Sequence, residues 1–128
     1  MNATTQKPIE AKNNEGIFFF QDAEQTTLRG ALGLADVTYQ CQLVKRDGPG
    51  KESYNLEGED QIGGRVTGII FREPPSMGAS GKPKPEFTGK VDTGSEESVM
   101  RFAGWVRHSS KDGKPFLSVT LSTLMKRD

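Results

Sequence analysis

Cysteine, histidine and tryptophan are scarce in this chain of 128 residues, which holds one of each. A single cysteine excludes a disulfide within the chain. One cysteine and one histidine also cannot supply the four ligands of a structural zinc site, and no carboxylate cluster with metal-binding spacing replaces them. We therefore expect neither a metal nor any other cofactor.

Long apolar runs and net charge are lacking as well. No run approaches the ~20 apolar residues of a membrane-spanning helix, and the N-terminus lacks the charged-then-apolar order of a signal peptide. The side chains AVILMFWYC make up only 33% of the residues, so a lean core completed by homo-oligomerisation is one hypothesis. We expect no membrane partner and a cytoplasmic location, in the host cell if the protein is viral.

The balanced charge, 17 basic against 17 acidic residues, is distributed unevenly along the chain. Residues 1–81 hold 8 Lys or Arg against 11 Asp or Glu, whereas residues 82–128 hold 9 against 6. Between residues 99 and 127 the count is six basic against one acidic. This asymmetry favours an anionic partner for the C-terminal part of the chain.

Short strand candidates separated by glycine-rich turns predict a mainly β fold, as a small antiparallel barrel or sandwich that includes an OB-like form. The candidates are 17–20, 37–44, a return strand that begins at 54–56, then 65–71 and 87–91, followed by a hairpin over 99–124.

The polar residues 1–15 are predicted to be a flexible N-terminal arm, and residues 16–128 a single β domain. Residues 21–27 suit a short helix or a loop. Residues 73–85, with four prolines and two glycines, are predicted to be a mobile loop.

The hairpin shows the clearest pattern. One parity of its two strands is apolar and carries Met100, Phe102 and Val106, then Leu117, Val119 and Leu121. The other parity carries Arg101, Ala103, Trp105 and Arg107, then Phe116, Ser118, Thr120 and Ser122. Asp112-Gly113 favours a tight turn between the strands, and Pro115 suits the start of the second.

An exposed aromatic face between cations is typical of single-stranded nucleic-acid binding, because aromatic planes stack on unpaired bases and cations hold phosphates. On this hypothesis Trp105 and Phe116 stack bases, and Arg101, Arg107, Lys111 and Lys114 hold phosphates. The further candidates are Tyr39 and Tyr54 for stacking, Lys45, Arg46 and Lys51 as a second cationic set, and Lys82 and Lys84 in the 73–85 loop. The alternative is that Trp105 and Phe116 pack under another sheet or subunit and that the cations form a solvated face.

Catalytic patterns are incomplete. His108, Ser109, Ser110 and Asp112 are the residue types of a hydrolase triad, but they share one turn, which is poor geometry for a nucleophile and its base. The segment 76–83 fails the phosphate-loop pattern, since it has Ser76 and Pro83 at two required positions. We expect a protein that is not an enzyme.

The sequences FAGWVR (102–107) and KDGKPFLSVTL (111–121) resemble a tryptophan-plus-KxGKxFLS signature of small uncharacterised proteins from bacteriophages and mobile elements. KPEFTGKV (84–91) resembles the lead-in of such proteins, so the resemblance covers residues 84–121. The whole chain also resembles small phage single-stranded-DNA-binding proteins that regulate transcription by a viral RNA polymerase. The resemblance implies an oligomeric DNA-binding β protein. The ending LMKRD (124–128) departs from the acidic tail of bacterial single-strand binders, so recruitment through such a tail is not expected.

The leading hypothesis is therefore a single-stranded-DNA-binding protein of weak sequence preference, phage-encoded and acting in viral DNA replication or transcription. An RNA polymerase or a replication protein would be its protein partner. The alternative is a protein-interaction module, an inhibitor or adaptor of a host or viral enzyme, that uses the same aromatic face and the 73–85 loop. A structural virion component is a third hypothesis.

Overall fold

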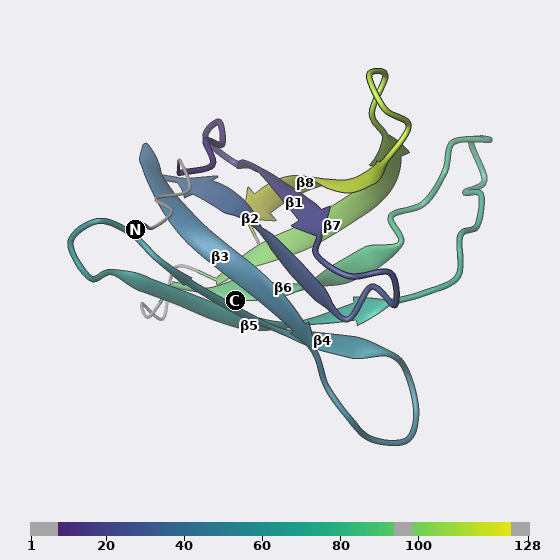
Figure 1. The fold of residues 1–128 in the computed structure, drawn as a ribbon, viewed down its shortest axis with the longest axis horizontal. Helices are drawn as coiled ribbons and strands as arrows, with labels where there is room; N and C mark the ends of the chain where they lie inside the picture. Colours follow the sequence, from purple (N-terminus) through teal and green to yellow (C-terminus); the bar gives the residue numbers. More distant parts are fainter. Residues whose placement is uncertain (1–7, 94–98, 124–128) are drawn as a thin grey trace, which may run out of the picture.

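Eight antiparallel strands form a closed barrel in the computed structural model, which describes residues 8–93 and 99–123 (Figure 1). The strands are β1 (Glu15–Phe20), β2 (Thr27–Leu34), β3 (Val37–Lys45), β4 (Ser53–Glu59), β5 (Arg65–Arg72), β6 (Phe87–Asp92), β7 (Val99–His108) and β8 (Pro115–Thr123). Each strand pairs with the next along the chain, and β8 pairs with β1. No described residue belongs to a helix, so none of these residues forms an apolar helix that could cross a membrane.

The expected fold class, mainly β as a small antiparallel barrel, is confirmed, and the hairpin of β7 and β8 has the expected parity. Phe102, Leu117 and Leu121 are buried, while Arg101 and Arg107 are exposed. The order of strands is that of an up-and-down barrel.

Strand β2 is absent from the sequence prediction, which expected a helix or loop over 21–27 and nothing regular after it. Residues 21–26 are a loop, and Thr27 begins the strand. The sequence of β2 shows little alternation between apolar and polar residues, because the outward positions 31 and 33 hold Ala31 and Gly33 instead of polar residues.

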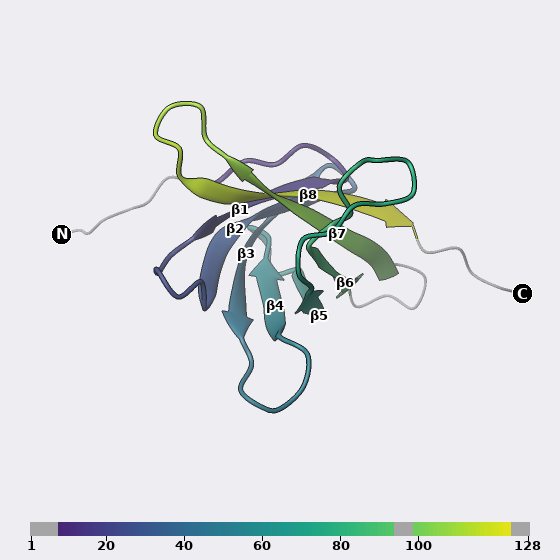
Figure 2. The ribbon, with the colours of Figure 1, turned by 90° about the vertical axis from the view of Figure 1, so that its right-hand side faces the viewer.

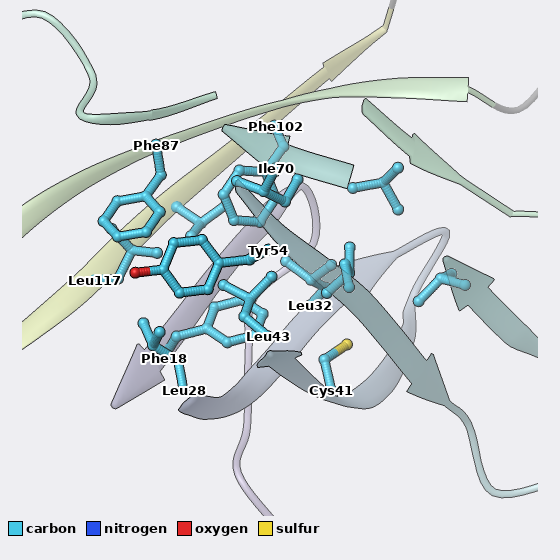
Figure 3. Packing of buried hydrophobic residues seen from close by; sticks show 14 of the residues in the cluster. Phe18, Leu28, Leu32, Cys41, Leu43, Tyr54, Ile70, Phe87, Phe102 and Leu117 are labelled. Carbon is cyan, nitrogen blue, oxygen red and sulfur yellow. The ribbon is translucent and has the colours of Figure 1, made fainter. Parts of the chain in front are cut away.

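The core is made by inward side chains from all eight strands, and Figure 3 shows a close view of it. Phe18 and Phe102 approach with ring centroids 6.1 Å apart, and both are fully buried. Burial of apolar area contributes about 25 cal/mol per Å², so these side chains supply the main driving force for closure.

Glycine at inward positions lets the strands of this narrow barrel approach and bend. A Cβ on Gly30 would lie 2.0 Å from the carbonyl oxygen of Ile17, and a Cβ on Gly68 would lie 2.2 Å from that of Lys90. Glycine kinks are a general means of closing a small barrel. The inward glycines also explain the low share of apolar side chains, because backbone atoms occupy interior space that side chains would otherwise fill.

The segment 8–14, within the predicted arm, lies against β2 and β3. The backbone N–H of Ile9 donates to Gln40 Oε1 over 3.0 Å, and Gln40 Nε2 donates to the Ile9 carbonyl over 2.7 Å. The N–H of Asn14 donates to the carbonyl of Gly33 over 2.8 Å. Residues 1–7 of the predicted arm lie outside the described residues.

A buried ion pair closes one end of the barrel. Arg72 Nε donates to Glu86 Oε2 over 2.7 Å, and only 19% and 13% of these two side chains are exposed. The Arg72 guanidinium lies 4.8 Å from the ring centroid of Phe87 and 5.9 Å from that of Phe20. The charge is therefore held by a carboxylate and covered by two aromatic faces.

Arg72→Ala should lower the free energy of unfolding by about 2–4 kcal/mol, because it leaves the Glu86 carboxylate unpaired in a largely buried site. Arg65→Ala is the matched control, since Arg65 pairs with Glu57 where both side chains are more than half exposed; its cost should be below about 1 kcal/mol. Urea unfolding followed by circular dichroism measures both. Equal losses for the two variants would contradict a structural role for the Arg72 pair.

Tyr54 adds a titratable group to the same end of the barrel. Burial, followed by the hydrogen bond to Glu52, raises the pKa of the Tyr54 phenol from 10.0 to about 12. The folded state therefore keeps a proton that the unfolded state loses first, and the stability from this group should fall as pH rises from about 10 to about 12. Thermal unfolding of the wild type and of Tyr54→Phe across this range measures the effect, and parallel pH profiles for the two proteins would contradict it.

Candidate nucleic-acid interface

A row of four side chains crosses the outer surface of neighbouring strands β7, β8, β1 and β2. Arg107 lies opposite Phe116, Phe116 opposite Phe19, and Phe19 opposite Arg29. The rings of Phe19 and Phe116 have centroids 6.3 Å apart at an interplanar angle of 37°, and Phe19 is 40% exposed. Strands lie about 4.8 Å apart, so the row spans roughly 14 Å with a cation at each end of an aromatic pair.

A groove of about 570 Å³ lies beside the aromatic pair, between the loop 21–26 and the turn 109–114. Phe19, Phe116 and Pro115 supply its apolar surface, and Lys114 lies at its edge. Its carboxylates stay ionised. A hydrogen bond from the Thr26 hydroxyl lowers the pKa of Asp22, and the backbone N–H of Lys114 lowers the pKa of Asp112.

Trp105 lies on β7 two residues before Arg107 and is half-buried. Its Nε1 donates a hydrogen bond to the carbonyl of Pro83 over 3.1 Å, so the 73–86 loop lies against the indole edge. Pro83, Lys84 and Met77 line a recess of about 280 Å³ together with Trp105 and Arg107. One edge of the Trp105 ring is therefore covered by a loop of the same chain.

The 73–85 segment, predicted to be a mobile loop, contains a small hairpin. Met77 and Pro83 form an isolated antiparallel bridge. The N–H of Gly78 donates to the Lys82 carbonyl over 2.8 Å, and the N–H of Lys84 donates to the Ser76 carbonyl over 2.9 Å. Both lysines are exposed, with Lys84 on the Trp105 side.

The up-and-down order of the strands brings every second loop to the same end of the barrel. Loops 21–26, 46–52, 73–86 and 109–114 share one end, and Figure 2 looks toward it. The cations that the sequence singled out at this end are Lys45, Arg46, Lys51, Lys82, Lys84, Arg107, Lys111 and Lys114, all exposed. Topology, which the sequence pattern did not specify, collects three separate cationic sets at one end of the barrel.

The two ends differ in charge over the described residues. Segments 21–26, 45–52, 72–86 and 107–114 hold nine Lys or Arg and seven Asp or Glu. The opposite end holds two Lys or Arg and seven Asp or Glu, in segments 8–15, 35–36, 57–65 and 92–93. Although the chain has no net charge, the barrel therefore has one acidic end. Repulsion from that end directs an anion toward the loop end, which carries the aromatic row.

Three candidates lie away from the aromatic row. Tyr54 is fully buried, and its hydroxyl lies 2.8 Å from both the Gln25 carbonyl and Glu52 Oε2, so it belongs to the core and offers no stacking surface. Tyr39 is half-buried against the core cluster, on the inward parity of β3 with Cys41 and Leu43. Arg101 is exposed but lies four residues from Trp105 along β7, roughly 13 Å away. The strict alternation of 37–43 made Tyr39 part of an apolar face, and that face is the inner one.

Sequence reasoning missed Phe19 and Arg29. The apolar run IFFF (17–20) predicts a buried strand, whereas in the structure Phe18 faces inward and Phe19 outward. Arg29 was missed together with β2. Alternation within the run would have identified Phe19, but its pairing with Phe116 depends on closure of the barrel.

No family model matches the sequence, and no curated protein or solved structure matches it either. Within residues 8–93 and 99–123, no group of three His, Cys, Asp or Glu side chains is placed to hold a metal ion.

Trp105→Phe should loosen the 73–86 loop, because phenylalanine keeps the ring but removes the donor to Pro83. Amide hydrogen exchange of Gly78 and Lys84 should accelerate several-fold, since the hairpin opens more often without this hydrogen bond. The amide of Gly113, which donates to Ser109 in the β7–β8 turn, is the internal control and should be unchanged. Unaltered exchange at both loop amides would show that the indole does not hold the loop.

Proposed function

We propose that this protein binds single-stranded DNA with weak sequence preference through the outer surface of β7, β8, β1 and β2. The observation that carries the proposal is the pair of rings formed by exposed Phe19 and half-buried Phe116, which lies between Arg107 and Arg29. Bases stack on aromatic rings with about 1–3 kcal/mol per base, and guanidinium groups hold phosphates.

The binding mode follows from the arrangement of the row. One or two bases stack on the Phe19 and Phe116 rings, with the groove beside them receiving the edge of a base. Arg107 and Arg29 hold phosphates on the two sides, and Lys111 and Lys114 extend the cationic surface into the turn. Stacking accepts every base because each has a π-face, so weak sequence preference is the expected consequence.

The loops at the same end lengthen the path. Lys84 lies beside Trp105, and Lys45, Arg46 and Lys51 lie on the neighbouring loop. We propose that these cations contribute to non-specific attraction of phosphates, which brings DNA to the aromatic row. The resemblance of the whole chain to phage single-stranded-DNA-binding transcription regulators supports a role in viral DNA replication or transcription in the host cytoplasm. We propose that the protein acts there as a homo-oligomer, with an RNA polymerase or a replication protein as its partner.

The decisive experiment titrates the protein with fluorescein-labelled oligothymidine and follows anisotropy at several salt concentrations, with a duplex of equal length in parallel. The wild type should bind the single strand in preference to the duplex. Phe116→Ala should weaken binding by about 1–3 kcal/mol, because it removes a stacking plane. Arg107→Gln should lower the slope of log affinity against log salt by about 0.7, the value for one phosphate on a single strand.

The controls are Val44→Ala and Arg65→Gln, which change an exposed apolar and an exposed cationic side chain on other strands and should leave binding unchanged. Absence of single-strand binding at low salt, or binding that does not weaken with salt, would contradict the proposal. Retention of a host or viral protein after nuclease treatment, with no oligothymidine binding, would instead support the protein-interaction module.

A further inference from the structure

A second exposed apolar surface lies on β5, β6 and β7, away from the aromatic row. Ile69 and Phe71 are 41% and 40% exposed there, and they line a groove of about 1040 Å³. Large apolar side chains at neighbouring outward positions of one strand are unusual on a solvated face, which normally alternates with polar residues. The groove therefore has the character of a binding surface.

Two cross-strand rows build this groove. In one row Ile69 lies opposite Lys90, and Lys90 opposite Arg101. In the next row, two residues or about 7 Å along the strands, Phe71 lies opposite Thr88, and Thr88 opposite Ala103. Thr88 and Ala103 are small, so they leave the ring of Phe71 accessible next to Lys90 and Arg101 of the first row.

The charges of the groove indicate its ligand. Lys90 and Arg101 are both exposed, and neither forms an ion pair with a described residue. By contrast, Arg65 at the far end of β5 is paired with Glu57. Asp92 also lines the groove, so two cations stand against one described carboxylate. An aromatic plane beside this excess of positive charge complements a ligand that is both planar and polyanionic.

The groove is continuous with the aromatic row along β7. Outward positions on this strand are Arg107, Trp105, Ala103 and Arg101 in succession, so one strand carries cations of both surfaces with the indole between them. Phe116 on β8 and Phe71 on β5 are separated by three strand spacings and by two rows, which is roughly 20 Å along the surface.

We propose that the β5–β6–β7 groove is a second subsite for the same DNA strand, with a base stacked on Phe71 and phosphates held by Lys90 and Arg101. This inference rests on the proposed function and adds to it a binding path that crosses β7. One chain then holds two separated stacking sites, and a strand long enough to reach both binds more tightly because the second contact is intramolecular.

The test compares (dT)3 and (dT)12 on the wild type and on the triple variant Phe71→Ala/Lys90→Gln/Arg101→Gln, with Trp105 emission and salt titration as readouts. The variant should bind (dT)12 at least about 5- to 150-fold more weakly, because the lost stacked base alone accounts for that factor and the two lost cations add to it. Its salt slope should fall by about 1.4, since two phosphate contacts are removed. Its affinity for (dT)3 detected at Trp105 should be unchanged, because the short strand reaches only the near subsite.

The outcomes separate the two proposals. A wild type that binds neither oligonucleotide overturns both. A triple variant that binds (dT)12 with wild-type affinity and salt slope overturns the second subsite and leaves the proposed function standing. Sedimentation of the free proteins adds a third outcome, because a wild type that self-associates beside a monomeric variant would make the groove an interface between copies of this chain. Val44→Ala/Arg65→Gln is the matched control and should behave as the wild type in every measurement.

Discussion

The pairing of β1 with β8 is the contact on which the rest of the structure depends. It joins the two ends of the chain's sheet, so every strand has two neighbours and no long edge remains unpaired. The same pairing sets Phe19 against Phe116 and thereby creates the aromatic row. Core, closure and candidate interface therefore share one register, and a slip of one residue would turn Phe19 inward and Phe18 outward.

A narrow barrel leaves little interior space for side chains, and two features of the sequence fit this constraint. Inward glycines such as Gly30 and Gly68 allow the strands to approach where a side chain would clash with a carbonyl. At one end, where the interior meets the loops, Arg72 and Glu86 neutralise each other beneath Phe20 and Phe87. The glycines reduce the interior volume that side chains must fill, and the ion pair avoids an unpaired charge in a largely buried site.

The outer surface is organised by topology. Because the strands run up and down in sequence order, alternate loops collect at one end, and cations far apart in the chain share that end with the aromatic row. The acidic residues of the described segments dominate the opposite end. A chain with no net charge is in this way polarised along the barrel, which favours one direction of approach for an anionic ligand.

The sequence by itself determined the fold class, the position of most strands and the two faces of the β7–β8 hairpin, because these depend on a period of two that is local to each segment. It correctly placed Phe102 and Leu117 inside and Arg107 outside. Tertiary structure alone decided that β2 exists despite its weak pattern, that the apolar parity containing Tyr39 faces the core, and that Tyr54 is buried. It also decided which outward residues lie opposite one another, since Phe19 and Phe116, like Lys90 and Arg101, come from different strands. Their juxtaposition is set by register and closure, which no local pattern encodes.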